Sequence, residues 1–191
     1  AILQGLQELK QKAGILDKDI DRIAHGTTVA TNALLQRKGA RVAVATTAGF
    51  RDLLEIGRQV RPLIYDLQVD APAALADRHN RLELRERIAA DGTVVTPLTE
   101  LEIDKFITEF KTLEGIESLA ICCLFSFLNP AHEQQIAAAV RRECPDIYVS
   151  VSSEVQPEFR EYERFSTTLI NAFLQPEVSR YMERLQAAIS K

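Results

Sequence analysis

The residues from His25 to Asn32 form the segment whose chemistry is best suited to hold a ligand. They read His-Gly-Thr-Thr-Val-Ala-Thr-Asn and lie between a predicted strand at 22–25 and a predicted helix at 29–37. Backbone N–H groups and hydroxyls at such a turn can bind phosphate or carboxylate, and the helix dipole favours the anion. The candidate site residues of this segment are His25, Gly26, Thr27, Thr28 and Asn32.

The same segment also has a purely structural interpretation. Thr27 or Thr28 can serve only to cap the helix, and His25 can be an ordinary residue at the end of a strand. Capped turns between a strand and a helix are common. The residues alone therefore favour the structural interpretation slightly.

A second candidate is Arg58, in a loop that follows a predicted strand at 42–46. Several arginines gather between residues 49 and 62, and guanidinium groups suit carboxylate or phosphate ligands. For any single arginine, the more common alternative is a solvated side chain that pairs with Asp52 or Glu55.

Glu154 and Arg164 form the third candidate. Glu154 directly follows a predicted strand at 147–151, at the position where ligand sites gather in α/β proteins. Arg164 lies three residues after Glu161, and this spacing also suits an ion pair on the surface of a helix. A functional role for Glu154 stays open, whereas the pattern favours a structural role for the helix that carries Arg164.

The remaining histidines and the cysteines predict no catalytic or metal site. His79 lies in a polar stretch and His132 in the first turn of a predicted helix, so we expect both at the surface. No Cys/His spacing is typical of a zinc site. Cys122 and Cys123 are adjacent in an apolar run, which predicts buried, unpaired thiols in a reducing, cytoplasmic compartment. The sequence also lacks GxSxG, Walker A and GxGxxG motifs, so the residues alone identify no reaction.

Alternating strands and helices predict an α/β fold with a mainly parallel sheet and flanking helices. The order of strand, helix and strand at 22–25, 29–37 and 42–46 is typical of a βαβ unit. The pattern resumes with a helix at 99–113, which a capping box of Thr99 and Glu102 starts. The other predicted elements are a helix at 2–13 before Gly14, strands at 119–125 and 147–151, a helix from Asn129-Pro130, and a helix from Phe159 onward that is interrupted near Pro176.

Residues 62–97 predict a small antiparallel insertion. Residues 82–89 alternate like a strand, Asp91-Gly92 is a hairpin turn signal, and residues 93–95 are predicted to form the returning strand. The whole chain, residues 1–191, is predicted to be one domain that carries this insertion.

The composition is that of an ordinary globular domain and argues against two classes of partner. Of the 191 residues, 46% are hydrophobic and 26% charged, and the net charge is −4. No run of Lys and Arg forms the basic stripe that binds nucleic acid. No apolar run reaches the roughly 18 residues that suggest a membrane span.

Segments along most of the chain occur in the order found in one enzyme family. They are HGTTVATNALL (25–35), KGA (38–40), TTAGFRDLLEIGRQ (46–59), ER (86–87) with DG (91–92), CLFSFLNPAHE (123–133), SEV (153–155), REYER (160–164), STT (166–168) and NA (171–172). Each is weak alone, but together they are specific. They resemble the N-terminal domain of the hydantoinase A / 5-oxoprolinase family.

The resemblance implies an enzyme that opens a cyclic amide, such as a hydantoin or 5-oxoproline, with ATP hydrolysis. In this family ATP phosphorylates the ring carbonyl oxygen, which makes the amide easier for water to attack. The family's nucleotide fold resembles the actin/hexokinase superfamily, with ATP and Mg²⁺ bound between two halves, and this chain resembles part of one half. Two alternatives are a subunit of an acetone carboxylase-like enzyme, in which ATP activates a ketone or bicarbonate, and a non-catalytic binding or regulatory module.

The resemblance also implies partners. Family members carry a Gly-Gly-Thr phosphate loop before the helix predicted at 2–13, and a larger domain after the part that matches this chain. We therefore expect the 191-residue chain alone to be inactive and to bind no cofactor tightly. The implied partners are a cyclic-amide substrate, the C-terminal hydantoinase A domain and a hydantoinase B-type subunit or domain. The implied site residues are those of 25–32 first, then Arg58, Glu154 and Arg164.

Overall fold

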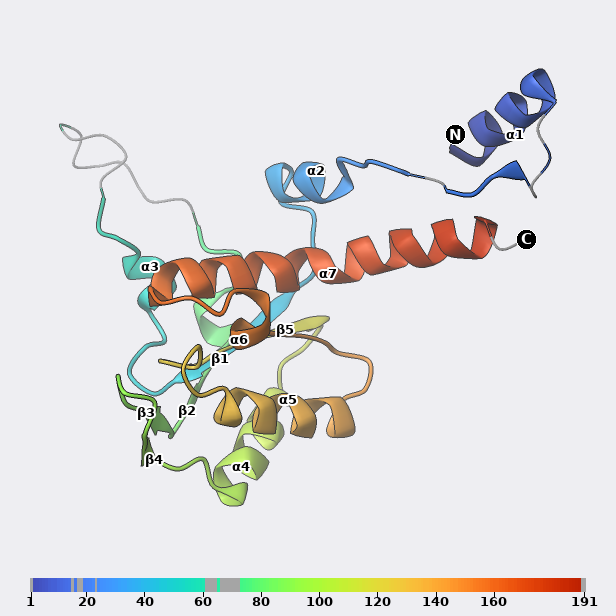
Figure 1. Ribbon diagram of the computed structural model, residues 1–191. Helices are drawn as coiled ribbons and strands as arrows, with labels where there is room; N and C mark the ends of the chain where they lie inside the picture. Colours follow the sequence, from blue (N-terminus) through green and yellow to red (C-terminus); the bar gives the residue numbers. More distant parts are fainter. Residues whose placement is uncertain are drawn as a thin grey trace.

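A four-stranded parallel sheet is the centre of the fold. In the computed structural model, which describes residues 2–14, 16, 19–22, 24–60, 65 and 73–189, the strand order is β2-β1-β5-β6. The strands are β1 (Val42–Thr47), β2 (Arg81–Leu84), β5 (Ser118–Cys122) and β6 (Tyr148–Val151). Helices cover both faces of the sheet (Figure 1), so the predicted α/β fold with a mainly parallel sheet is confirmed.

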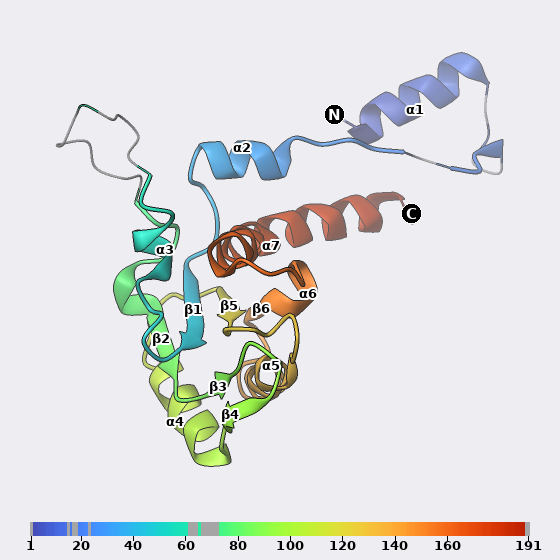
Figure 2. The ribbon, with the colours of Figure 1, turned by 60° about the vertical axis from the view of Figure 1, so that its left-hand side comes forward.

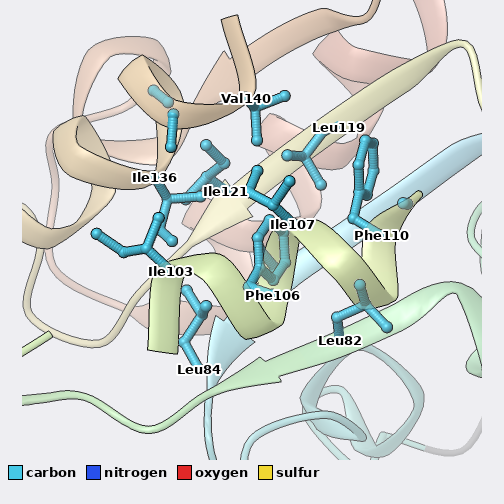
Figure 3. Close-up of a cluster of buried hydrophobic side chains, with 14 of the residues drawn as sticks. Leu82, Leu84, Ile103, Phe106, Ile107, Phe110, Leu119, Ile121, Ile136 and Val140 are labelled. Atoms are coloured by element: carbon cyan, nitrogen blue, oxygen red, sulfur yellow. The ribbon is translucent and has the colours of Figure 1, made fainter. Parts of the chain in front are cut away.

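The side chains of the central strands alternate between two apolar cores. Val42 and Val44 face α7 (Glu161–Ile189), whereas Ala43 and Ala45 face the core formed with α4 (Glu100–Phe110) and α5 (Ala131–Glu143). A strand covered on both faces needs small or apolar residues at nearly every position, and β1 is buried throughout. Figure 3 shows the core on the α4 and α5 side, with Leu82, Leu84, Ile103, Phe106, Ile107, Phe110, Leu119, Ile121, Ile136 and Val140 labelled.

Helix α4 begins where the capping box predicts. The Thr99 hydroxyl oxygen accepts a hydrogen bond from the Glu102 backbone N–H at 3.3 Å. The Glu102 carboxylate does not complete the box, because it accepts from the backbone N–H of Arg85 at 3.3 Å. The hydrogen bond from the Thr99 side of the predicted capping box is thus present. The Glu102 side chain instead ties α4 to the segment that follows β2.

The antiparallel part of the molecule is smaller than predicted. A hairpin joins β3 (Arg87–Ile88) and β4 (Val94–Thr96), and Gly92 occupies its turn with a positive φ of 83°. The single strand predicted at 82–89 is wrong, because residues 81–84 form β2 of the parallel sheet. The strand ends after Leu84, because the leucines of β2 pack under α4 whereas Glu86 turns into the interior. Residues 62–64 and 66–72 of the predicted insertion lie outside the described residues.

The first part of the chain departs most from the prediction. Helix α1 (Ile2–Ala13) ends at Gly14 with φ 64°, as predicted. The strand predicted at 22–25 is wrong for residues 22, 24 and 25, which are exposed and irregular, while residue 23 lies outside the described residues. A lone strand has no hydrogen-bonding neighbour to stabilise it, and none of the described strands pairs with this segment. Figures 1 and 2 show α1 standing away from the sheet, near the C-terminal end of α7.

Helix α7 continues through Pro176, so the interruption predicted there is wrong. The turns on either side of a proline keep their own hydrogen bonds, and the turn before Pro176 is fixed by packing on the sheet. The approach to the sheet is close here, since a Cβ added at Gly39 would collide with the ring of Phe173. The Ala40 N–H donates to the Phe173 carbonyl at 2.9 Å, which joins α7 to the start of β1.

The remaining elements are α2 (Val29–Leu35), α3 (Leu53–Ile56), α6 (Ser152–Val155) and a 3-10 turn at Arg78–Asn80.

Candidate functional site

The carboxyl ends of the four parallel strands meet at one edge of the sheet. From β1 the chain crosses to β2 on one side, and from β2 it passes back over β1 to β5 on the other side. The direction of winding therefore reverses between β1 and β5. In open α/β sheets, ligands bind in the crevice outside the carboxyl ends at such a reversal. The loops that flank this point are residues 48–52 and 123–129.

Several of the segments that carry the family resemblance gather at the same edge. Residues 46–59 include the end of β1 and the loop after it, and residues 86–87 follow β2. Residues 123–133 follow β5, and residues 153–164 follow β6. Segments far apart in the sequence thus meet where parallel sheets place their ligands.

A buried chain of hydrogen bonds crosses the reversal point. The Leu124 N–H donates to the Thr47 hydroxyl oxygen at 3.0 Å, and the Thr47 hydroxyl donates to Oε1 of Glu86. The other oxygen of Glu86 lies 2.6 Å from Nδ1 of His132, and the Leu98 N–H donates to Nε2 of that ring at 3.3 Å. Because Nε2 accepts, a neutral His132 ring carries its proton on Nδ1 and donates it to Glu86.

Glu133, the next residue of α5, ties together the ends of β5 and β6. Its side chain is fully buried, and its Oε1 accepts from the Cys123 N–H at 2.8 Å and from the Ser152 hydroxyl at 2.6 Å. Its Oε2 accepts from the Ser153 N–H at 2.9 Å. A buried carboxylate is costly unless it is hydrogen-bonded, and these three donors supply that compensation.

His132 and Glu133 together reach residues at the carboxyl ends of all four strands. The prediction that His132 lies at the surface is wrong, since it is only 4% exposed. The position of His132 in the first turn of a helix does not indicate its partner. That partner is Glu86, which lies 46 residues earlier in the sequence. The useful signal is that both residues fall within segments of the family resemblance.

Arg164 is a buried structural residue at this edge. Its guanidinium donates to the Ser152 hydroxyl at 3.2 Å, to the Glu158 carbonyl at 2.9 Å and to the Cys123 carbonyl at 3.0 Å. The guanidinium carbon also lies 5.2 Å from the centre of the Phe127 ring. A surface ion pair with Glu161 is therefore not formed, because Arg164 turns inward and binds the strand ends.

Arg58 and Glu154 lie on the outside of the same region. Arg58 is 55% exposed and pairs with Glu163, in the first turn of α7, and not with Asp52 or Glu55. The carboxylate of Asp52 instead receives two hydrogen bonds from Arg78, at 2.8 and 2.9 Å, and these lower the pKa of Asp52. Glu154 is exposed in the short helix α6. Arg58, Glu154 and Arg164 thus belong to one region.

The loop before α2 has the local bonds of a structural turn. The Thr27 hydroxyl oxygen accepts from the Val29 N–H at 3.2 Å. Thr28 occupies the N-cap position, but its side chain makes no cap hydrogen bond and accepts only from the Asn32 side-chain amide, at 3.3 Å. Both threonines are exposed. The Thr28 hydroxyl is therefore not needed to start the helix.

His25 and its neighbours lie at the other end of α7. Nε2 of His25 is 2.6 Å from the Tyr181 hydroxyl, and Gly26 is exposed with open space around its Cα. Tyr181 lies about 25 Å further along α7 than Arg164, at about 1.5 Å per helical residue. The eight predicted site residues therefore fall into two groups. Asn32 lines a groove between α2 and α7, which also includes Val29, Ala33, Gln36, Lys38, Gly39, Glu177 and Arg180.

The thiols at the carboxyl edge are unsuited to nucleophilic catalysis. Cys122 and Cys123 are both fully buried and unpaired, as predicted. Burial raises the pKa of each thiol well above its usual value, and the nearby carboxylate of Glu133 adds to this effect.

In the part of the chain that the structure describes, no three His, Cys, Asp or Glu side chains gather to hold a metal ion. No helix among the described residues is long and apolar enough to cross a membrane.

Comparison with known proteins identifies the family. The family model described as the hydantoinase/oxoprolinase N-terminal region matches residues 1–144. The chain belongs to the hydantoinase/oxoprolinase family. Among hydantoinase/oxoprolinase relatives, the caprolactamase subunit alpha of Pseudomonas jessenii is 38% identical over 98% of this chain. The 5-oxoprolinase 1 of Arabidopsis thaliana is 34% identical over 85% of it.

Solved structures of hydantoinase/oxoprolinase relatives have the same fold. The crystal structure of ATP-dependent caprolactamase from P. jessenii matches 100% of this chain with a TM-score of 0.86 and 37% identity. A nucleotide-free acetone carboxylase matches 86% of it with a TM-score of 0.75 and 25% identity. The chain spans only part of these proteins, namely 28% of the caprolactamase subunit and 14% of the plant 5-oxoprolinase. It covers 25% of the acetone carboxylase chain.

The bonds of Glu133 generate a stability prediction. In Glu133→Gln an amide NH₂ replaces one acceptor oxygen, so at least one buried donor from Cys123, Ser152 or Ser153 loses its partner. We expect the free energy of unfolding to fall by about 1–3 kcal/mol, measured by urea denaturation.

The matched control is Glu143→Gln, on the same helix. Glu143 is exposed and pairs with Lys111 at 3.1 Å, so its loss should not shift the urea midpoint resolvably. Equal midpoints for the two variants would show that the Glu133 contacts do not stabilise the fold.

Proposed function

We propose that this chain is the N-terminal part of an ATP-dependent enzyme that hydrolyses a cyclic amide. The observation that carries the proposal is the match to ATP-dependent caprolactamase, which extends over the whole chain at 37% identity. The relationship to 5-oxoprolinases supports the same substrate class, because caprolactam and 5-oxoproline are both lactams. A hydantoin is a related cyclic amide and remains within the proposal.

The chemistry explains why such a reaction would use ATP. An amide carbon resists attack by water because the nitrogen lone pair is delocalised onto the carbonyl. Phosphorylation of the carbonyl oxygen removes this stabilisation and supplies a leaving group, and ATP is the phosphoryl donor that we propose for the intact enzyme. We assign no residue of this chain to Mg²⁺, because no group of three candidate ligands gathers among its described residues.

The residues of this chain would supply the framework and part of the wall of the site. We propose that the loops at the carboxyl ends of β1 and β5 line the ligand crevice, with Arg58 and Glu154 at its rim. The loop at 25–32 is proposed to contribute a second wall, and its His25 contacts Tyr181, which lies about 25 Å along α7 from Arg164. The part of the longer protein that completes the nucleotide cleft and a hydantoinase B-type subunit or domain are the proposed partners. A cytoplasmic location would keep the three unpaired thiols reduced.

The second candidate function is ATP-dependent carboxylation of a ketone. The gamma subunit of acetophenone carboxylase from Aromatoleum aromaticum is 34% identical over 82% of this chain. The acetone carboxylase structure has the same fold over 86% of it. Both candidate reactions activate a carbonyl group with ATP, so the fold of this region suits either one.

A substrate panel on the intact enzyme tests the proposal. The longer protein, with its partner subunit, should form ADP, inorganic phosphate and the ring-opened product in equal amounts. That product is an amino acid from caprolactam or 5-oxoproline and an N-carbamoyl amino acid from hydantoin. Mass spectrometry of the product and an ADP assay measure this. ADP formation only with a ketone and bicarbonate would favour the carboxylase, and no turnover with any of these would favour a binding module.

Nucleotide binding by the 191-residue chain alone should be weak. A nucleotide site depends on backbone donors that cradle the phosphates and on metal ligands, and the described residues gather no such ligands. Calorimetry with Mg-ATP should give a dissociation constant weaker than about 100 µM. A micromolar constant, on the order of −8 kcal/mol, would show that this region binds the nucleotide by itself.

Thr28 separates the ligand-binding and capping interpretations of the loop at 25–32. Its hydroxyl makes no cap bond, so Thr28→Val should leave the melting temperature of the intact enzyme nearly unchanged. If the hydroxyl stabilises charge that develops during the reaction, kcat should fall on the order of 10²-fold.

Thr27→Val is the matched control, because it removes the acceptor for the Val29 N–H. We expect it to lower stability by up to about 1 kcal/mol. Normal turnover by Thr28→Val would remove the loop from the proposed site.

A further inference from the structure

The loops on either side of the reversal point are joined by one side chain. Thr47 is the last residue of β1, and its hydroxyl oxygen accepts the N–H of Leu124, two residues after the end of β5, at 3.0 Å. Its proton is directed to Glu86. Thr47 is 1% exposed and Leu124 3% exposed, so water does not compete for this contact. The orientation of the Thr47 hydroxyl therefore depends on the Glu86 carboxylate.

The residue held by this contact starts a strained loop. Phe125, directly after Leu124, has a positive φ of 53°, which is a rare conformation for a bulky side chain. Its carbonyl accepts from the N–H groups of Leu128 and Asn129, at 3.0 and 3.2 Å. Strained backbone persists only where its surroundings over-determine it. The anchor at Leu124 is one of these constraints.

His132 fixes the direction of the whole chain of bonds. Its Nε2 receives the Leu98 N–H, so its Nδ1 must donate to Glu86, and Glu86 can then accept from Thr47. The side chains of His132 and Glu86 are 5% and 0% exposed, so neither can touch a ligand in the crevice. Any effect of His132 on the reaction must act through Thr47 and the loop.

We infer that His132 is a positioning residue of this enzyme. Through Glu86 and Thr47 it sets the geometry of the loop at 123–129, which is proposed to line the ligand crevice at the carboxyl ends of β1 and β5. The inference rests on the proposed function, because that function places the ligand at this crevice. Glu133 forms a separate branch, which holds Cys123 and not Leu124.

Two substitutions of His132 distinguish positioning from packing. His132→Asn can place an amide donor near the position of Nδ1 and keep the bond to Glu86. His132→Gln places its amide near the position of Nε2, so it can accept from Leu98 but leaves Glu86 without this donor. Both replace the imidazole by a smaller amide, so a general loss of packing would affect both.

Amide hydrogen exchange on the 191-residue chain is the first test. In His132→Gln the Leu124 amide should exchange about 10-fold faster than in the native chain, while the adjacent Cys123 amide stays protected by Glu133. In His132→Asn both amides should stay within about 3-fold of the native rates. Equal acceleration of the two amides in His132→Gln would overturn the inference, because it would indicate a general loss of stability.

Kinetics of the intact enzyme are the second test. His132→Gln should lower kcat about 10- to 100-fold with KM for the lactam nearly unchanged, since misplacing groups around bound substrate affects reaction more than binding. His132→Asn should restore most of kcat. Equal kcat values for the two variants would overturn the inference. Absence of turnover by the native enzyme would overturn the proposed function instead, and the exchange rates would still show whether His132 holds the loop.

Discussion

The carboxyl edge of the sheet depends on the hydrogen bonds of two buried residues at the start of α5. His132 and Glu133 are neighbours in the sequence, yet they point to different strands and bind them by different routes. One works through a second carboxylate, Glu86, and the other accepts three hydrogen bonds directly. Buried polar groups of this kind stabilise only when every member is satisfied, so the whole set has to form together.

Apolar packing and polar bonding have separate tasks in this fold. The two cores, under α7 and under α4 and α5, hold the strands side by side and are insensitive to the exact position of any loop. The directional bonds lie at one edge only, where they fix loops that apolar contacts would leave variable. This division suits a family whose members act on different substrates, since the edge can change while the cores stay the same.

The sequence was informative where local patterns decide the structure. The apolar runs of β1 and β5, the face of α4 and the Thr99 cap all depend on residues close in the chain, and each was predicted. The partition of residues 81–88 between two sheets was not, because alternation cannot show which neighbour a strand will have. The continuity of the helix through Pro176 was missed for a related reason, since packing on the sheet overrides a local helix breaker.

The candidate site was predictable only as a set of segments. Glu154 and Arg58 were chosen for their positions after strands and Arg164 from the family resemblance, and the structure brings them to one region. The burial of His132 could not be foreseen, because its partner lies 46 residues away in sequence. The partner of Arg164 was also misjudged, since helical spacing suggested Glu161 while its acceptors are Glu158 and two residues that follow strand ends, Cys123 and Ser152. Long-range pairing of polar groups leaves almost no trace in a single sequence.

The length of α7 sets a rule for how this region can vary. One continuous helix carries Arg164 at the carboxyl edge and Tyr181 beside the loop at 25–32. An α-helix is stiff, and each residue adds about 1.5 Å to its length and about 100° of rotation about its axis. Inserting or deleting one residue between these two points would shift their spacing only slightly, but it would swing one of them to another side of the helix. The number of residues between Arg164 and Tyr181 can therefore change only in steps close to whole helical turns.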